Sequence, residues 1–302
     1  MRSRCIAILP NAGLGNMLFS WAHAQVFAAL NDMPACAIGW SRPRIGPLLR
    51  GQRLRFYGRS LKQPLSGIVA CGLLRARGKV VRNPPLQRVV DSPSLKRDHL
   101  FVWDEIPHWS DFFGALKPFR DLVKQRIWDT VNPSVRLRVI EAERPAIAVH
   151  IRCADFRKLE AGEDFRQVGS VRTPLEYFVS TIQEVRRCCG TDVPVTVFTD
   201  GRPGEIQSVL DLPSVRIAER NRPIFDLLQM SRAQLIIVSA SSTFGYWAGF
   251  LSDSPVILHP DHIHASHRPA WINERYFEGA AMGAFEKWPE VLIRNARDLR
   301  CE

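Results

Sequence analysis

After Pro145 the chain alternates short apolar runs with segments of helical character, and this alternation limits the possible folds more than any other feature. The apolar runs predict strands at 146–151, 195–198, 215–217, 235–239 and 256–259, and helices are expected at 204–210, 224–233 and 243–251. Another helix is expected where Thr173 can cap it, with Pro174 in its first position and Glu176 completing a capping box. Continuous apolar strands between helices indicate a parallel sheet that is covered on both faces.

The chain before Pro145 starts in the same way. We predict a strand at 5–9, a loop at 10–15, an apolar helix at 17–30 and a helix at 121–131, whereas 41–100 is rich in Pro, Gly and Arg and has no assignment. Pro133 and Pro145 bracket a short helix that is expected to connect two domains. The predicted fold is therefore α/β, with two Rossmann-like parallel-sheet domains, 1–140 and 141–302, facing a cleft.

The composition is typical of a soluble globular protein, with 46% hydrophobic and 24% charged residues in 302. No apolar run approaches the ~20 residues that cross a bilayer. The opening segment is expected to be a strand, because Pro10 ends its apolar part too early for a signal peptide. The seven cysteines are scattered and include no Cys-x-x-Cys, which favours reduced thiols. These features predict a cytoplasmic protein.

Positive charge is concentrated in one segment. The formal charge is +11, and between Arg42 and Arg97 fourteen Arg or Lys residues stand against one acid, Asp91. Such a field attracts nucleic acid, anionic lipid head groups or phosphorylated glycans, although a merely solvated basic face accounts for it equally well. No RNA- or DNA-binding motif accompanies the charge, so we expect no nucleic-acid partner.

The strand at 146–151 ends in charged side chains, namely His150, Arg152, Asp155 and Arg157. The carboxyl ends of parallel strands open onto the crevice where open α/β sheets bind ligands. A guanidinium placed there suits a diphosphate, whose oxygens it can contact in bidentate fashion. A structural ion pair between Arg152 and Asp155 is the alternative, and the two readings stand side by side at this point.

Two other strand ends offer groups for binding an anion. The loop Asn11-Ala-Gly-Leu-Gly-Asn16 resembles a dinucleotide fingerprint, but Leu18 stands in place of the third glycine, which argues against NAD(P). Its glycines still let backbone N–H groups and the Asn16 amide approach a ligand. The strand at 235–239 runs into four hydroxyls at a helix start, where orphan N–H groups and the helix dipole attract anions; they are Ser239, Ser241, Ser242 and Thr243.

Four further features carry less specific signals. Asp200 at the end of another strand suits guanine or ribose donors, or else an Asx turn. The aromatic side chains of the helix at 243–251 are expected to be core packing more than sugar stacking. The tract with His259, His262, His264 and His267 is expected to be a loop with incidental histidines, not a zinc site. Cys153 is expected not to be a nucleophile, because no activating arrangement beyond the nearby His150 is visible in the sequence.

Taken in order, these segments resemble the fucosyltransferases of glycosyltransferase family 11, chiefly bacterial α-1,2-fucosyltransferases, within a superfamily that includes α-1,6- and protein O-fucosyltransferases. Four sequence elements of the family are matched in part, namely Gly-Leu-Gly-Asn-x-x-Phe-x-x-Ala, His-Ile-Arg-Arg-Gly-Asp-Tyr, Phe-Ser-Asp-Asp and Asp-Leu…Met-Ser…Asn-Ser-Thr-Phe-Ser-Trp-Trp. The matching residues are Gly13, Leu14, Gly15, Asn16, Phe19, Ala22, His150, Ile151, Arg152, Asp155, Phe198, Asp200, Asp226, Leu227, Met230, Ser231, Ser242, Thr243, Phe244 and Trp247. The chain departs from these motifs at Cys153, Ala154, Gly201 and Ser241, where the family has Arg, Gly, Asp and Asn.

The resemblance implies a GT-B-like fold and an inverting, metal-independent transfer of L-fucose from GDP-fucose to a glycan hydroxyl, as an α-1,2 linkage. Arg152 would neutralise the departing phosphate. The catalytic base would be Glu160 or, second, Asp155. The donor would contact Gly15, Asn16, His150, Arg152, Asp200, Ser242, Thr243 and Phe244. No cofactor or metal is implied beyond this donor substrate.

The expected acceptor is a surface-polysaccharide or lipid-linked glycan precursor, met in the cytoplasm or at the anionic inner face of the membrane. The main alternative is a non-catalytic or altered-specificity GDP-sugar-binding relative, because Cys153 and Gly201 replace a guanidinium and a carboxylate of the motif.

Overall fold

The computed structural model describes residues 2–42, 56–62, 65–88, 97–262 and 265–299. The chain divides into two compact units, Met1–Ile140 and Glu141–Glu302. Each contains its own parallel sheet, so the α/β class with two Rossmann-like sheets, predicted from the sequence, is confirmed. Within the described residues, no helix is long and apolar enough to cross a membrane.

The N-terminal unit is a four-stranded sheet in the order β2-β1-β4-β3. Its elements are β1 (Arg4–Ile8), α1 (Leu14–Leu30), β2 (Ala35–Ile38), α3 (Leu65–Arg77), β3 (Lys79–Arg82), β4 (His99–Trp103) and α4 (Arg120–Thr130), with α5 (Pro133–Glu141) at the end of the unit. The rings of Phe101 and Trp103 on β4 lie 4.8 and 4.9 Å from the ring of Phe27 on α1, so aromatic packing fixes this helix to the sheet.

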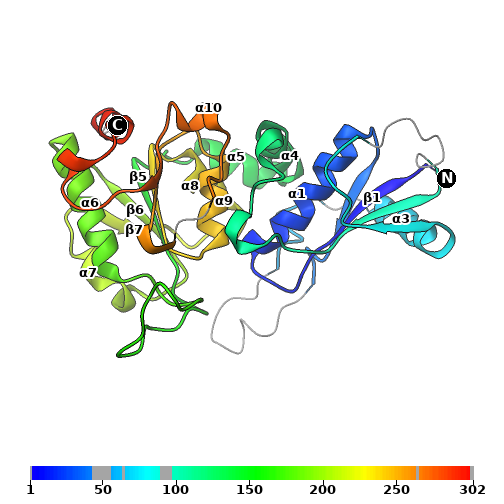
Figure 1. The fold of residues 1–302 in the computed structure, drawn as a ribbon. Helices are drawn as coiled ribbons and strands as arrows, with labels where there is room; N and C mark the ends of the chain where they lie inside the picture. The colour runs from blue at the N-terminus through cyan, green and yellow to red at the C-terminus, as the bar shows by residue number, and fades with distance from the viewer. Residues whose placement is uncertain (1, 43–55, 63–64, 89–96, 263–264, 300–302) are drawn as a thin grey trace. The chain divides into compact units, whose positions relative to one another are not determined.

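The C-terminal unit is a six-stranded sheet in the order β10-β9-β8-β5-β6-β7. Its elements are β5 (Ile147–Ile151), α6 (Leu175–Cys189), β6 (Val195–Thr199), α7 (Gln207–Leu210), β7 (Val215–Ile217), α8 (Pro223–Arg232), β8 (Leu235–Val238), α9 (Thr243–Leu251), β9 (Val256–Leu258), α10 (Ala270–Asn273), β10 (Glu278–Ala280) and α11 (Glu290–Arg297). In Figure 1, α6 and α7 lie on one side of this sheet, and α8 and α9 lie on the other.

The predicted strands and helices after Pro145 are all present, with shifts of one or a few residues at their ends. The predicted cap of α6 is wrong. The helix begins at Leu175 with Pro174 as N-cap, and the Thr173 hydroxyl instead accepts a hydrogen bond from the Ala240 N–H at 2.9 Å. The Thr173 hydroxyl, which the local sequence pattern assigned to the start of the helix, therefore bonds instead to Ala240, a residue distant in sequence.

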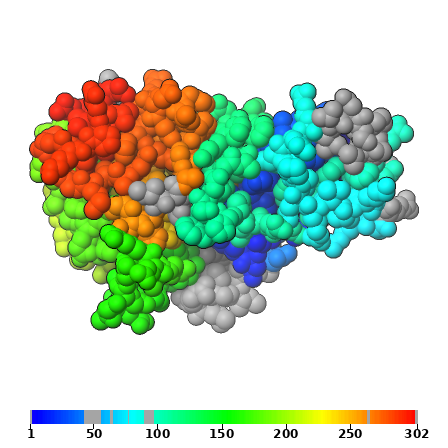
Figure 2. Space-filling view, in the orientation of Figure 1, coloured from blue at the N-terminus to red at the C-terminus, as the bar shows by residue number. Residues whose placement is uncertain are grey.

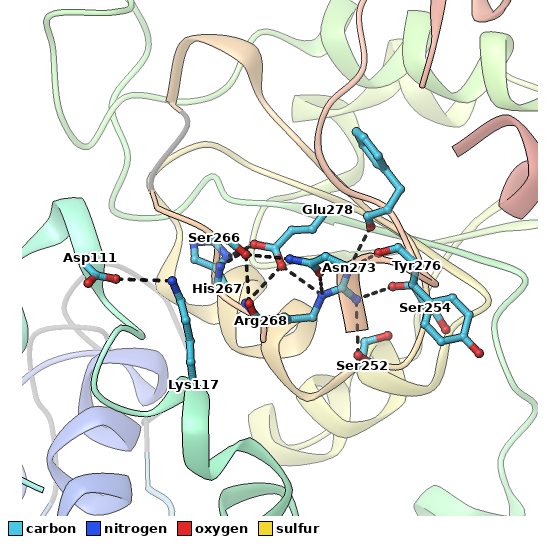
Figure 3. A network of polar contacts seen from close by, with 11 residues as sticks. Asp111, Lys117, Ser252, Ser254, Ser266, His267, Arg268, Asn273, Tyr276 and Glu278 are labelled. Atoms are coloured by element: carbon cyan, nitrogen blue, oxygen red, sulfur yellow. Dashed lines mark hydrogen bonds and ion pairs between the residues drawn. The ribbon is translucent and has the colours of Figure 1, made fainter. Parts of the chain in front are cut away.

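The strand β10 and the helices α10 and α11 were not predicted. The segment Glu278–Ala280 has no apolar run from which a strand could be predicted. Its residue Glu278 instead forms a buried ion pair. The side chains of Arg268 and Glu278 are 0% and 2% exposed, and their Nε and Oε2 atoms are 3.0 Å apart. The same guanidinium donates to the carbonyls of Ser254 at 2.6 Å and Phe277 at 2.9 Å, which lie just before β9 and β10 (Figure 3).

We expect Arg268→Ala to lower the free energy of unfolding of the full chain by about 3–5 kcal/mol, because it leaves a buried carboxylate and several carbonyls unpaired. Urea denaturation followed by circular dichroism measures this. The matched control is Arg216→Ala, which removes an exposed pair with Glu143, 2.6 Å away, and should cost about 1 kcal/mol or less. Equal losses in the two variants would contradict a stabilising role for the buried pair.

Candidate donor site at a sheet edge

The strand order of the C-terminal unit reverses between β5 and β8. From β5 the chain proceeds outward through β6 and β7, and then returns to the other side of β5 through α8 to form β8. Open α/β sheets bind ligands outside the carboxyl ends of the strands at such a reversal. The backbone N–H of Arg152 donates to Ser239 Oγ at 2.9 Å, which joins the two strand ends at this point. The fold therefore places Arg152 at the position where a ligand is expected.

The guanidinium of Arg152 is held between two carboxylates. It forms ion pairs with Asp155 and Asp200, and its side chain is 17% exposed. Its central carbon also lies 5.7 Å from the centre of the Phe156 ring. The two interpretations from the sequence, a diphosphate-binding guanidinium and a structural ion pair with Asp155, are thus compatible, because Arg152 forms the ion pair and still reaches solvent.

Asp200 organises the segment that carries Arg152. One oxygen accepts the backbone N–H groups of Cys153 at 2.8 Å and Ala154 at 3.1 Å, and the other pairs with Arg152. Burial opposes ionisation of this carboxyl, but Arg152 and the two N–H donors outweigh it and hold the pKa of Asp200 below its usual value. Both oxygens are therefore engaged within the chain, which leaves Asp200 little capacity to accept from a nucleoside.

His150 lies beneath this segment and is almost fully buried. Burial is the main cause that lowers the pKa of its imidazole to about 4, with Asp200 opposing the shift and Arg152 adding to it. Its ring centre is 5.4 Å from that of Phe244, and a Cβ added at Gly245 would lie 3.0 Å from its Nδ1. Nδ1 has no hydrogen-bond partner among the described residues. At neutral pH the side chain is an uncharged imidazole with one vacant nitrogen.

The four hydroxyls after β8 divide into two pairs. Ser239 Oγ donates to the His150 carbonyl at 2.9 Å, and Ser241 Oγ lies 3.1 Å from His262 Nδ1, so both hold the fold together. Ser242 is the N-cap of α9, but its hydroxyl makes no capping bond. In the described part of the chain, neither Ser242 nor Thr243 has a hydrogen-bond partner for its hydroxyl. These two hydroxyls and the first N–H groups of α9 together form a candidate phosphate site.

The backbone at Ser241 has a φ of 56°, in the left-handed region. Asn adopts this region more readily than Ser, because its short polar side chain can bond locally. The motif that the chain resembles has Asn at this position, so the departure at Ser241 retains the backbone turn while losing the residue that favours it.

The departures at Cys153 and Gly201 lie in contact with each other. A Cβ added at Gly201 would lie 2.7 Å from the Sγ of Cys153 and 2.9 Å from its Cβ, which is too close for any L side chain. Cys153 is 2% exposed, and burial raises the pKa of its thiol. The pair therefore packs as a small apolar contact beneath the Arg152 segment, and Cys153 has the character of a buried thiol.

The two candidate bases lie on the segment between β5 and α6, which Figure 2 shows in green at the surface of the C-terminal unit. The Glu160 side chain is 76% exposed and its oxygen lies 3.8 Å from Arg157. Arg157 pairs more closely with Glu163, through two bonds of 2.5 Å, and that pairing is the main cause that lowers the pKa of Glu163 to about 2. Glu160 is thus a solvated carboxylate, whereas Asp155 is engaged by Arg152.

Asp226 is a further candidate ligand residue, which the sequence matched to the Asp-Leu element of the motif without giving it a role. It lies in the first turn of α8, which follows the carboxyl end of β7 and so starts at the same edge as Arg152. Burial raises the pKa of this carboxyl to about 7, and its Oδ1 has no partner among the described residues. An acid in the first turn of a helix at this edge, within the apolar run Ile224–Leu228, was the available signal. A buried vacant carboxyl is suited to bind a ligand that brings its own donors.

In the N-terminal unit, the predicted residues Gly15 and Asn16 lie in the first turn of α1, after the N-cap Gly13. This helix begins at the carboxyl end of β1, beside the reversal of strand order between β1 and β4. Asn16 Oδ1 is buried, and no described residue donates to it. The structure therefore presents candidate ligand contacts in this unit as well.

The described histidines after β9 are packed among aromatic rings. The ring of His259 lies 4.7 Å from that of Tyr177, and the ring of His267 lies 4.7 Å from that of Tyr246. His264 lies outside the described residues. Trp247 and Phe250 of α9 are fully buried with their rings 5.3 Å apart, in keeping with the core packing expected from the sequence.

A scan against protein-family models and a search of curated proteins gave no match. Solved structures similar to this chain include POFUT1 in complex with GDP, with 15% identity over 88% of this chain and 96% of that one and a TM-score of 0.48. Others are NodZ α-1,6-fucosyltransferase soaked with GDP-fucose (14% identity, 85% and 95% covered, TM-score 0.45) and a mutant of Arabidopsis thaliana FUT1 in complex with GDP (12%, 88% and 75%, TM-score 0.44).

We expect His150 to make the protein sensitive to acid between pH 6.5 and 5. The folded imidazole stays neutral down to about pH 4, whereas in the unfolded chain it takes up a proton near its ordinary pKa of about 6.5. Stability is therefore lost as the pH falls below the unfolded pKa, by about 2 kcal/mol at pH 5. Urea denaturation at pH 7 and pH 5 should show a smaller acid loss in His150→Gln than in the wild type. Identical losses would mean that His150 is protonated in the folded state.

Proposed function

We propose that this chain is a glycosyltransferase that moves L-fucose from GDP-fucose to a glycan hydroxyl, with inversion and an α-1,2 linkage. The observation that carries the proposal is the position of Arg152, at the reversal of strand order and joined through Ser239 to the strand that leads to Ser242 and Thr243. A guanidinium and two hydroxyls without partners in the described part of the chain, at one edge of the sheet, are the groups that bind a diphosphate. The motif resemblance supplies guanine and fucose as the nucleoside and sugar.

Donor binding would require Arg152 to exchange partners. With Asp155 and Asp200 both paired to it, the cluster has a net charge of −1 and repels a diphosphate. Asp200 is fixed by two backbone N–H groups, whereas Asp155 has its bond to Arg152 and is 37% exposed. We propose that the β-phosphate displaces Asp155 from Arg152. The released Asp155 would then be a free carboxylate beside the reacting centre.

The chemistry follows from this arrangement. The acceptor oxygen would attack C1 of the β-linked fucose from the face opposite the phosphate, and the C1–O bond would break with its electron pair passing to GDP. Arg152 and the donors at the start of α9 would stabilise the charge that develops on the β-phosphate. The acceptor proton would pass to a carboxylate. Glu160 remains the first candidate for this base by resemblance, and Asp155 is the second.

Nucleoside recognition is proposed to differ from the expectation based on sequence. Asp200 was expected to accept from guanine or ribose, and His150 to be a donor contact, but both oxygens of Asp200 are engaged within the chain. Asp226 offers a buried vacant oxygen at the same edge, and a carboxylate can accept from the N1–H and 2-amino group of guanine together. We therefore propose Asp226 as the principal nucleoside contact, with Gly15, Asn16 and Phe244 as further donor contacts.

We expect Arg152→Ala to lower kcat/KM at least 100-fold, about 3 kcal/mol, because the variant loses charge stabilisation of the leaving phosphate. Release of GDP from GDP-fucose in the presence of acceptor measures this. Arg152→Lys should recover only part of the activity, since it lacks the bidentate fork. The matched control Arg216→Ala should be unaffected. An Arg152→Ala variant that retains a tenth of wild-type activity would rule out this role.

Transfer is proposed to need no metal ion, because no Asp-x-Asp element lies at a strand end and Arg152 supplies the positive charge. No group of three potential ligands lies together in the described ranges. We expect full turnover in EDTA. Loss of turnover that Mg²⁺ or Mn²⁺ restores would refute the proposal and make Asp200 a candidate ligand.

The alternative, a non-catalytic or altered-specificity GDP-sugar-binding relative, is distinguished by two measurements. Calorimetry with GDP-fucose, GDP-mannose and UDP-sugars identifies the donor. Release of GDP that depends on acceptor marks an enzyme, whereas donor binding without such release marks a binding protein.

The basic segment is proposed to make peripheral contact with the anionic inner face of the membrane, where a cytoplasmic enzyme meets lipid-linked acceptors. Arg44, Arg50, Arg53, Arg55 and Lys96 lie outside the described residues, so the proposal rests on the charge of the sequence. Each cation near such a surface contributes about 1 kcal/mol. We expect cosedimentation with anionic vesicles that weakens steeply with salt. Equal recovery with neutral vesicles would leave the segment as a solubilising face.

A further inference from the structure

A second hollow lies in the C-terminal unit, away from the reversal of strand order. Its volume is about 380 Å³, and it opens where β9 and β10 end, at the same carboxyl edge as Arg152. Aromatic, apolar and acidic side chains line it, among them Tyr177, Glu184, His259, Asp261, Met282 and Trp288. None of the roles proposed above for the donor uses this hollow.

Two uncharged N–H donors on its wall have no partner among the described residues. His259 Nδ1 accepts the Asp261 N–H at 3.2 Å, and burial lowers the pKa of this imidazole to about 4, so the ring is neutral and its proton is on Nε2. The indole of Trp288 is 6% exposed, and its Nε1–H is buried without an acceptor. A buried donor left unpaired costs about 1–3 kcal/mol. Because the Trp288 nitrogen is closed off from solvent, the indole has to turn for an oxygen of a ligand to reach its N–H.

The acceptors of the hollow are carboxylates with remaining lone pairs. Glu184 Oε2 accepts the Phe285 N–H at 2.9 Å and its Oε1 accepts from Arg187 at 3.1 Å, while Asp261 Oδ1 accepts from Arg166 at 2.8 Å. Each carboxylate offers about four acceptor positions, so capacity remains for hydroxyl donors. The described lining residues include no Lys or Arg. An anion such as a nucleotide is therefore disfavoured, whereas a neutral ligand with many hydroxyls can use both the N–H donors and the carboxylates.

Apolar surface completes the match to a sugar. The Met282 side chain is 67% exposed, and Tyr177 presents its ring beside that of His259. One face of a pyranose ring carries only C–H groups and packs on such surfaces, while its rim carries hydroxyls. Ligand sites of this kind combine apolar walls with a few polar groups that fix orientation.

The hollow is joined to the segment that carries Glu160. The Phe165 ring lies 4.9 Å from the ring of His259, and Arg166 pairs with Asp261, so this segment contacts two residues that line the hollow. In the sheet, β9 is two strands from β5, which corresponds to about 10 Å at the usual strand spacing. A short oligosaccharide can span that distance.

We propose that this hollow binds a neutral sugar unit of the acceptor glycan, remote from the hydroxyl that receives fucose. The proposal rests on the function proposed above, which it extends from the donor to the acceptor. It assigns the selection of the glycan to the end of β9 and β10, separately from the selection of the nucleotide.

The test uses the full chain labelled with [¹⁵N]tryptophan, in which Trp288→Phe assigns the Trp288 indole N–H resonance. Lactose, N,N′-diacetylchitobiose and mannobiose are titrated to concentrations on the order of 10 mM, with and without GDP, which detects millimolar binding. We expect at least one disaccharide to shift this resonance saturably, and GDP alone to leave it unmoved. No shift with any of the three, or a shift caused by GDP, would overturn the proposal.

Two variants of α6 locate the binding. Ser180 lines the hollow from an exposed helix position, so Ser180→Tyr should fill the space and abolish the shift. Gln183 is exposed on the same helix but does not line the hollow, and Gln183→Tyr should retain the shift. Loss or retention of the shift in both variants would place the sugar elsewhere.

The outcomes separate this proposal from the donor chemistry. If a disaccharide shifts the Trp288 resonance but GDP-fucose is neither bound nor turned over, the sugar site stands and the fucosyltransferase proposal fails. If fucose is transferred while no disaccharide shifts the resonance and Ser180→Tyr leaves the acceptor KM unchanged, the transfer stands and this site is overturned.

Discussion

The carboxylate of Asp200 is the interaction on which the donor site depends. It accepts hydrogen bonds from two consecutive backbone N–H groups after β5 and from one nitrogen of the Arg152 guanidinium. It therefore fixes both the backbone after β5 and the direction of the guanidinium. A long flexible side chain at a strand end would otherwise sample many rotamers and lose that entropy on binding a ligand. Because β6 delivers Asp200 to the position beside Arg152, the pairing of β5 with β6 sets the geometry of the site.

The contrast between two arginines shows how burial separates a structural role from a functional one. Arg268 is almost fully buried and donates to several carbonyls as well as to Glu278. If a ligand replaced one of these partners, that partner would be left buried without a hydrogen bond. Arg152 is 17% exposed, and one of its partners, Asp155, also reaches solvent. Water can solvate Asp155 when another anion replaces it. Charge alone therefore does not identify a ligand site, whereas charge that can change partners does.

The elements of the C-terminal unit from β5 to β9 were predictable from the sequence, because hydrophobic periodicity is a local property that survives folding, whereas β10, α10 and α11 were missed. The edge location of Arg152, Ser242 and Thr243 followed from the same pattern, since parallel strands bring their carboxyl ends together. Hydrogen bonds between residues far apart in the sequence could not be predicted from this local pattern. Thr173 bonds to an N–H 67 residues away, and Asp200 to groups 46 and 47 residues away. The burial that sets Asp226 apart depends likewise on neighbours that only the fold supplies.

The contact between Gly201 and Cys153 constrains the order in which this motif can change. A side chain at position 201 would collide with a thiol that is itself enclosed, and the Cys153 N–H is bonded to Asp200. A single exchange of Gly201 for aspartate would therefore disturb the segment that carries Arg152. The side chain at position 153 must therefore turn away or change before position 201 can carry an acid. Packing thus couples positions 153 and 201, and an engineered change at position 201 has to be accompanied by a change at position 153.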